Sequence, residues 1–204
     1  MISEAELRAE MDVCHLLARA FENVPVRETL LDERMAIACA RFGKDDMADV
    51  ASSLAKMAAE ATEDDMRAMR IDYTRICCGA SDDAPLPYSS IYSDEGRLLK
   101  GSCCAALVDE YAQNGFVPRE TESNEPEDFL PTLLDYLAFL CEKACAAIAE
   151  GDEVQAEKVY AKARAFKAVY VDAWALQYCA EARDLIDTPY YQGILDILEA
   201  YCAE

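Results

Sequence analysis

The stretch EPEDFLPTLLDYLAFL, residues 125–140, joins an acidic turn directly to a long apolar run. The apolar run predicts a helix that continues to Glu150 and is stopped by Gly151, a residue suited to ending helices. Pro131 places the start of this helix near Asp128, because proline is tolerated in a first turn whose N–H groups have no partner within the helix. The carboxylates of the turn are then expected to cap the helix and to complement its dipole.

The rest of the chain is predicted to be helical as well. Its 204 residues include only seven Gly and seven Pro, the two residues that cost most in helix interiors. Helix starts are indicated by Ser3 with Glu6, by Thr62 with Asp65, and by Thr188 before a proline. No strand-like alternation is sustained, so we expect an all-α, single-domain helical bundle of about eight or nine helices over residues 1–204. The predicted helices include 27–41 and 172–186, and irregular loops are expected near 80–97 and 116–125.

The charge of the chain limits the partners that it can bind. The sequence holds 19 Lys and Arg against 40 Asp and Glu, a net charge of −21. Such a field repels nucleic-acid phosphates and anionic lipid surfaces and attracts cationic partners, so we expect no nucleic acid as a partner. No apolar run reaches the roughly twenty residues that span a bilayer, and the acidic N-terminus does not resemble a signal peptide. We therefore expect a cytoplasmic protein without membrane insertion.

The sequence predicts no metal site, no cofactor and no catalytic site. No C-x-x-C motif occurs, and the single histidine, His15, has no partner indicated by spacing. Both glycine-rich phosphate-binding motifs are absent, so nucleotide binding is not predicted. The ten cysteines are expected to be reduced and to act as small buried hydrophobic residues. Six of them are grouped in the sequence, as the pairs Cys77 with Cys78, Cys103 with Cys104, and Cys141 with Cys145.

Four segments stand in an order and spacing that is typical of one protein family. They are YTRIC at 73–77, PYSSIY at 87–92, EPEDF at 125–129, and a tryptophan at position 174 followed by TPYY at 188–191. From about residue 65 to the end, this pattern resembles the TorD/DmsD family of cytoplasmic redox-enzyme maturation chaperones, with its Y-x-x-L-F, P-Y-x-S-V-Y, E-P-x-D-H and S-P-F-Y motifs. Phe129 stands where the family usually has His, and Cys77 where it usually has Phe, so this site has no imidazole at the usual position.

The resemblance implies a non-enzymatic chaperone. Such a protein binds the twin-arginine signal peptide, the apo catalytic subunit of a molybdopterin-containing anaerobic reductase, or both, and holds the client until its cofactor is inserted before export. A leader with two arginines and an apolar core calls for carboxylates beside an apolar groove. Three alternatives stay open: an assembly factor for a non-exported, nitrate-reductase-like subunit, a metal or cluster carrier that uses the thiols, and a hydrolase. The sequence leaves open which client is bound and whether the chain is a monomer or a dimer.

The candidate client-binding residues come from the segments that carry the resemblance. One or two carboxylates of the acidic turn are expected to face the loop at 80–97 and to receive the arginines of the leader. Tyr73 is in phase with Met69 and Ile76 and is expected in the core, whereas Asp72 is expected on a more exposed face. The full set of candidates is Asp72, Tyr73, Tyr88, Tyr92, Glu125, Glu127, Asp128 and Phe129.

Overall fold

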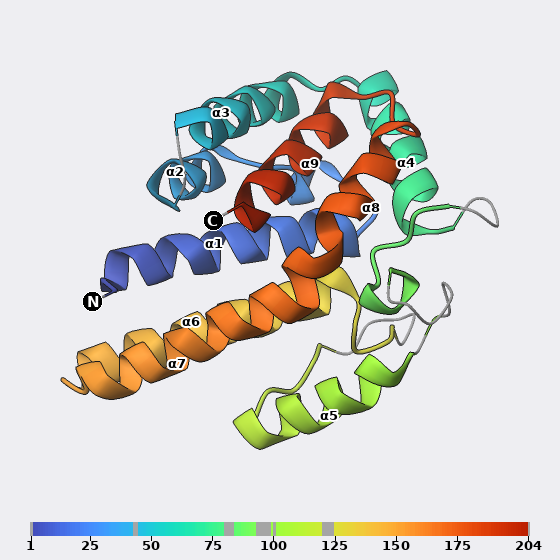
Figure 1. Cartoon of the computed structure of the whole chain (residues 1–204). Helices are drawn as coiled ribbons and strands as arrows, with labels where there is room; N and C mark the ends of the chain where they lie inside the picture. Colours follow the sequence, from blue (N-terminus) through green and yellow to red (C-terminus); the bar gives the residue numbers. More distant parts are fainter. Residues whose placement is uncertain are drawn as a thin grey trace.

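The computed structural model describes residues 2–42, 45–79, 84–92, 99, 101–119 and 125–203, and these residues form an all-helical structure (Figure 1), as predicted. No helix among these ranges combines the length and the hydropathy needed to cross a membrane. The helical elements are α1 (Glu4–Glu22), η1 (Arg27–Thr29), α2 (Glu33–Phe42), α3 (Asp45–Glu60), α4 (Glu63–Cys77), η2 (Ser89–Ile91), α5 (Ser102–Asn114), α6 (Leu130–Ala149), α7 (Glu153–Lys167), η3 (Ala168–Asp172), α8 (Ala173–Arg183) and α9 (Pro189–Cys202).

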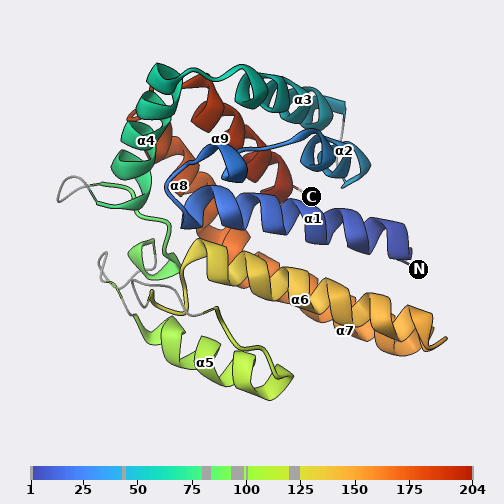
Figure 2. The ribbon, with the colours of Figure 1, turned by 180° about the vertical axis from the view of Figure 1, so that it is seen from behind.

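Two groups of helices share one core. Helix α1 packs along α6, which packs in turn against α7, and these three long helices lie side by side in both views (Figures 1 and 2). The second group contains α2, α3, α4, α8 and α9, with α9 packed against both α3 and α8. Helix α6 is central, since Leu133, Leu134, Tyr136 and Leu137 on it are fully buried. The apolar run quoted above therefore forms the middle of the hydrophobic core.

Local capping chemistry sets most helix ends where the sequence placed them. The Ser3 hydroxyl and the Glu6 carboxylate form the predicted capping box, and Thr62 with Asp65 forms a second one. The side chain of Thr188 accepts a hydrogen bond from the backbone N–H of Tyr191 at the start of α9. At the C-terminal ends, α5 stops at Gly115 and α6 is followed by Gly151. Both glycines have a left-handed backbone, with φ of 73° and 80°. These predictions are confirmed.

The predicted helix at 27–41 is wrong in its first half. The chain forms only the 3₁₀ turn η1 over residues 27–29 and then runs extended before α2 begins at Glu33. Leu30 and Leu31 are buried in this extended segment. The backbone N–H of Leu31 donates a hydrogen bond to the phenol oxygen of Tyr190 in α9 at 3.0 Å. A tertiary hydrogen bond thus replaces the helical one. Gly43, the residue that the sequence offers as the stop of this helix, lies outside the described residues.

Helices α3 and α9 approach each other closely at Gly193. A Cβ atom at this position would lie 2.7 Å from Cδ2 and 3.0 Å from Cγ of Leu54, which is itself buried in α3. Any larger residue would have to push Leu54 out of its place in the core. Glycine is required here for the space between two helices, and its backbone conformation is ordinary.

A polar pocket of about 340 Å³ lies between the start of α1, the end of α2 and the junction of α7 with η3. Its walls include Glu10, Arg164 and Lys167. Glu10 is only 4% exposed and accepts a hydrogen bond from the phenol of Tyr201 at 3.3 Å. Burial raises the pKa of Glu10 above its usual 4.5, against the opposing effects of the Tyr201 hydroxyl and the Lys167 charge.

We expect Glu10→Gln to be at least as stable as the wild-type protein at neutral pH. Because the folded-state pKa of Glu10 is raised, its contribution to stability is fully present below the unfolded pKa and is lost as pH rises through the folded pKa. The uncharged amide of Gln cannot ionise. The free energy of unfolding of the variant should therefore not fall with rising pH in the way expected for the wild-type protein. Urea unfolding at a series of pH values from 4 upward measures it, with the exposed Glu142→Gln as control. An unchanged pH dependence in Glu10→Gln would contradict the assignment.

Candidate functional site

The loop at 84–92 and the turn at 125–129 are joined by backbone hydrogen bonds. The N–H of Leu130 donates to the carbonyl of Pro87 at 2.8 Å, and the N–H of Ser89 donates to the carbonyl of Asp128 at 3.1 Å. Tyr88 and Phe129 form an isolated antiparallel bridge between these two bonds. Two segments that are about forty residues apart in the sequence therefore form one rigid unit at the N-terminus of α6.

Asp128 is the polar centre of this unit. Its side chain is fully buried, and Oδ2 accepts the backbone N–H of Ser90 at 2.7 Å. The thiol of Cys104 donates to Oδ1 at 3.2 Å, and the Cys103 sulfur lies 4.0 Å from Oδ2. Burial, together with the Asp128 carboxylate, raises the pKa of the Cys104 thiol above its usual range. Asp128 thus faces the loop, while the expectation that a carboxylate of the turn receives the arginines of a leader stays a prediction.

The expected capping of α6 by the acidic turn is wrong. The helix begins at Leu130 with Phe129 as its N-cap residue, whose side chain makes no capping hydrogen bond. The Asp128 carboxylate is directed to the 84–92 loop and to α5, so it cannot also reach back to the first turn of α6. Pro131 in the first turn removes one of the donors that a cap would have to satisfy.

Aromatic rings connect the loop to the turn and to α5. Tyr88 is buried and stacks on Phe129 with ring centroids 5.0 Å apart, while its hydroxyl donates to the Glu125 carboxylate at 2.5 Å. Burial and the neighbouring Glu125 carboxylate raise the pKa of Tyr88, so its hydroxyl stays a donor. Tyr111 of α5 donates to the backbone carbonyl of Glu127 at 2.9 Å. Both ends of the acidic turn are thus held by phenols.

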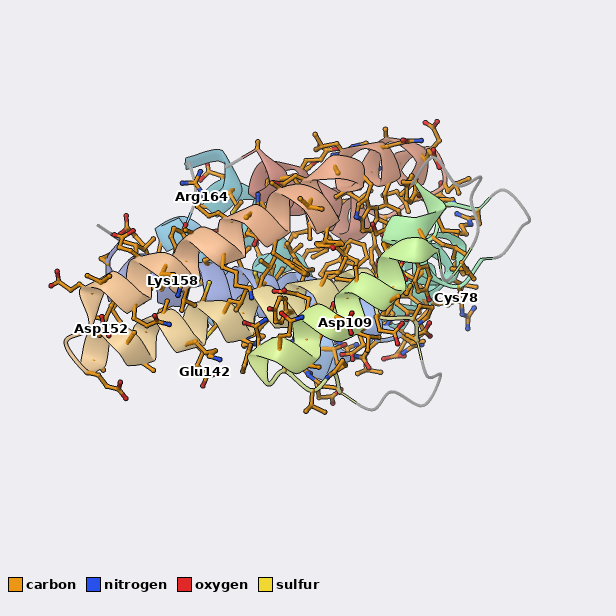
Figure 3. All side chains as sticks on the ribbon, turned by 60° about the horizontal axis from the view of Figure 1, so that its bottom comes forward. Cys78, Asp109, Glu142, Asp152, Lys158 and Arg164 are labelled. Carbon is orange, nitrogen blue, oxygen red and sulfur yellow. The ribbon has the colours of Figure 1, made fainter. Side chains whose placement is uncertain are left out.

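The C-terminal turn of α4 lies beside Glu125. Tyr73 is 6% exposed and its hydroxyl donates to the carbonyl of Glu22 at 3.0 Å, which confirms the prediction that it packs in the core. Burial is the main cause of the raised pKa values of Tyr73 and Cys78, and the negative charge of Glu125 adds to both. Cys78 is exposed at this side of the molecule, where Figure 3 labels it. Three of the four resembling segments therefore meet around one carboxylate.

The prediction that Asp72 lies on a more exposed face is wrong, because this residue is only 1% exposed. Its carboxylate accepts the N–H groups of Asp187 at 3.1 Å and of Thr188 at 2.8 Å, and Arg75 lies 3.4 Å away. It therefore secures the segment that leads into α9. The segment after α8 covers this face of α4, and helical periodicity within α4 cannot reveal such a cover.

Tyr92 connects the loop to the fourth resembling segment. Its ring stacks on Trp174 with centroids 5.3 Å apart and an interplanar angle of 15°. Trp174 is 3% exposed at the start of α8, and its indole N–H donates to the carbonyl of Tyr170 at 2.6 Å. The four segments thus belong to one aromatic and hydrogen-bonded unit at this end of the bundle.

Two carboxylates of this unit are only half-buried, those of Glu125 and Glu127. Glu125 is held by the Tyr88 hydroxyl. Over the described part of the chain, the Glu127 carboxylate has neither a hydrogen bond nor an ion pair. A carboxylate on a rigid turn beside aromatic rings can accept paired hydrogen bonds from a guanidinium group. Asp128, Phe129 and Tyr88 are buried behind these two residues and hold them in place.

All ten cysteines are outside disulfides, and most of them are buried, as predicted. The contact between Cys104 and Asp128 could not be predicted, because 24 residues separate them and no spaced motif links them. His15 is exposed on α1 between the buried Cys14 and Leu16. A separate groove of about 830 Å³ lies between η1, α2 and α3, lined by Leu30, Ile37 and neighbouring residues, and the sequence did not predict it.

Known proteins share the part of the chain that carries this unit. A model of the family described as "Nitrate reductase delta subunit" matches residues 44–180. A Chaperone protein TorD from Vibrio cholerae serotype O1 is 38% identical over 69 residues, which are 34% of this chain and 30% of the relative. Another Chaperone protein TorD, from Vibrio vulnificus, is 24% identical over 135 residues, which are 64% of this chain and 59% of the relative. The matches thus span between about a third and three fifths of these curated relatives.

Proposed function

The chain belongs to the nitrate reductase delta subunit family and is TorD-like, and from this membership we propose that it is a cytoplasmic, non-enzymatic chaperone for the assembly of a molybdoenzyme. Its client is the apo catalytic subunit of a molybdopterin-containing reductase, which it holds until the cofactor has been inserted. We propose further that it recognises the twin-arginine leader of that subunit.

The observation that carries the proposal is the position of Glu125 and Glu127. Both are half-exposed on a turn that is fixed by Tyr88, Tyr111 and the buried Asp128. A rigid acceptor loses little conformational entropy when it binds, so its hydrogen bonds to a guanidinium contribute more affinity. The net charge of −21 attracts a cationic leader from a distance, and the turn provides the specific contact.

The candidate residues divide between contact and support. We propose that Glu125 and Glu127 bind the two arginines, and that Tyr92 contributes apolar surface to the leader. Tyr88, Phe129 and Asp128 support the turn from behind, since all three are buried. Tyr73 and Asp72 act further away, Tyr73 by fixing the end of α4 beside Glu125 and Asp72 by fixing the entry to α9.

A second candidate function is favoured by the printed name of the family. If the chain assembles a non-exported, nitrate-reductase-like subunit, the client has no twin-arginine leader, and the acidic turn binds arginines of the mature subunit. Both functions use the same carboxylates. They differ in whether the isolated leader peptide is sufficient for binding.

The test is the affinity of a fluorescent twin-arginine leader peptide, measured by anisotropy. We expect Glu125→Lys/Glu127→Lys to weaken binding at least about 100-fold, because each lost charge-assisted hydrogen bond contributes roughly 1.5–3 kcal/mol and 2.7 kcal/mol is a factor of about 100. Glu125→Gln/Glu127→Gln keeps an acceptor oxygen at both positions. Its affinity for the leader should therefore lie between that of the wild-type protein and that of the double lysine variant. A twin-lysine leader should bind the wild-type protein more weakly, because lysine cannot form the bidentate pair.

The matched control is Glu142→Lys on α6. Glu142 is exposed and lies well away from Cys78 (Figure 3). Its replacement by lysine therefore changes the charge in the same direction, but far from the proposed binding site. We expect less than about a threefold effect, since exposed charges are screened beyond roughly 8–10 Å at physiological salt. Glu142→Lys makes half the charge change of the double variant, so a loss of binding free energy at least half as large in this control would mean that only net charge matters, and the site assignment would fail. Strong binding of the mature subunit without leader binding would favour the second function.

A further inference from the structure

The structure brings two thiols and a buried carboxylate together at the start of α5. The sulfur atoms of Cys103 and Cys104 and a carboxylate oxygen of Asp128 all lie within 4.8 Å of one another. Asp128 is fully buried, Cys104 is 8% exposed, and Cys103 is half-buried. From this geometry we propose that Cys103, Cys104 and Asp128 bind a thiophilic divalent metal ion of the Zn²⁺ class.

The spacing of the three groups fits a tetrahedral ion after small side-chain movements. With Zn–S bonds of about 2.3 Å and Zn–O bonds of about 2.0–2.2 Å, neighbouring ligand atoms in a tetrahedron lie roughly 3.5–3.8 Å apart. The Cys104 sulfur already lies 3.2 Å from one Asp128 oxygen, and the Cys103 sulfur lies 4.0 Å from the other. Rotation of the half-buried Cys103 about its side-chain bonds can close the remaining gap without moving the backbone.

The surroundings favour a bound cation. Cys103 and Cys104 lie in the first turn of α5, with the carboxylate of Asp128 beside both sulfur atoms. Among the described residues, no lysine or arginine forms an ion pair with the buried Asp128 carboxylate. The backbone N–H of Ser90 bonds to Asp128 and orients its carboxylate, as outer-shell partners orient metal ligands.

The donor set selects the kind of metal. Two sulfur ligands and one oxygen suit Zn²⁺ or Cd²⁺ and are unsuited to Ca²⁺ and Mg²⁺, which take oxygen ligands. An iron–sulfur cluster requires about four cysteines, and this site provides two. Three protein ligands leave the fourth tetrahedral position for water or for a donor from a partner. On binding, each thiol that becomes a ligand releases its proton to solvent.

The metal site uses other residues than Glu125 and Glu127, the proposed contacts of the leader, and shares with leader binding only Asp128, which supports the turn from behind. A bound ion would connect α5, the turn at 125–129 and, through Ser90, the loop at 84–92. The groups that the sequence analysis treated as separate buried thiols would then form one functional site. The alternative is that Cys104 only donates a hydrogen bond to Asp128, with no affinity for metal.

The experiment titrates the full chain, reduced and freed of metal, with Zn²⁺ in competition with a chromophoric chelator. We expect one equivalent to bind tightly to the wild-type protein. Cys103→Ser and Cys104→Ser should each lose more than the roughly 10–100-fold that removal of an outer-shell partner costs. The controls are Cys78→Ser, which removes an exposed thiol, and Cys202→Ser, which removes a half-buried one. Both thiols lie outside the proposed site, so both variants should keep the wild-type affinity for Zn²⁺.

Two further measurements keep the test decisive if a variant folds poorly. Cd²⁺ should give a thiolate charge-transfer absorption that corresponds to two sulfur ligands in the wild-type protein and to one in Cys103→Ser, whose helix content is checked by circular dichroism. Zn²⁺ should raise the melting temperature of the wild-type protein and have no such effect on Cys103→Ser/Cys104→Ser. The proposal is overturned if the wild-type protein binds no equivalent tightly, or if the equivalent persists unchanged in the double variant.

Discussion

Asp72→Ala is expected to destabilise the protein by about 3 kcal/mol. The substitution leaves the buried backbone N–H of Thr188 and the partly buried N–H of Asp187 without their acceptor, and a buried, unsatisfied donor costs roughly 1–3 kcal/mol. It also removes one of the two carboxylates near Arg75, which keeps its closer partner Asp187 at 2.7 Å. Since a typical domain is stable by about 5–15 kcal/mol, this single change should remove a large part of the total.

Guanidinium unfolding followed by fluorescence measures this effect. Trp174 is the single tryptophan of the chain, so the signal reports on the core next to the site. The control Asp109→Ala removes an exposed carboxylate on α5, labelled in Figure 3, and should stay within about 0.5 kcal/mol of the wild-type protein. If Asp72→Ala behaves like Asp109→Ala, then Asp72 does not hold the entry to α9.

Trp174→Ala is expected to cost about 3–5 kcal/mol, the usual range for truncating a buried aromatic residue. Trp174 is 3% exposed and contacts Tyr92 by stacking and Tyr178 edge-on. Its loss creates a cavity in the core and removes the ring on which Tyr92 rests. The 84–92 loop should therefore become locally less stable, in addition to the global loss.

The measurement combines urea unfolding by circular dichroism with hydrogen exchange. In Trp174→Ala, amide protection at Tyr92 and its neighbours should fall by more than the global loss of stability explains. Trp174→Phe keeps a stacking ring and should cost less, and Leu176→Ala, half-exposed on the same helix, should stay near the wild-type stability. Unchanged protection at 84–92 in a destabilised Trp174→Ala protein would show that the stack does not anchor the loop.

Features set by local chemistry could be predicted from the sequence. The capping boxes at Ser3 and Thr62 and the cap at Thr188 depend on groups three residues apart, and all three are present in the structure. The burial of α6 follows from its apolar composition, and the burial of Tyr73 follows from the helical period of α4. The meeting of the 84–92 loop with the acidic turn was also expected, from the resemblance.

Features set by distant segments could not be predicted in this way. The N–H of Leu31 bonds to Tyr190, which lies 159 positions later, and this contact replaces the predicted helix at 27–32. Asp72 is buried by the segment that precedes α9, 115 positions away, although its neighbours in α4 suggested exposure. Asp128 turns towards α5 instead of capping α6, and nothing near it in the sequence distinguishes the two roles.

The central claim is that the acidic turn binds the catalytic subunit of a molybdoenzyme. The most direct measurement is affinity capture from the chain's own host, grown without oxygen, with the tagged wild-type protein, Glu125→Lys/Glu127→Lys and Glu142→Lys in parallel. Mass spectrometry then compares the amounts of recovered subunits and shows whether their leaders are intact. We predict that a molybdopterin-containing reductase subunit is enriched equally by the wild-type protein and Glu142→Lys and is largely lost with the double variant. Recovery of no such subunit, or the same amount with all three proteins, would contradict the claim.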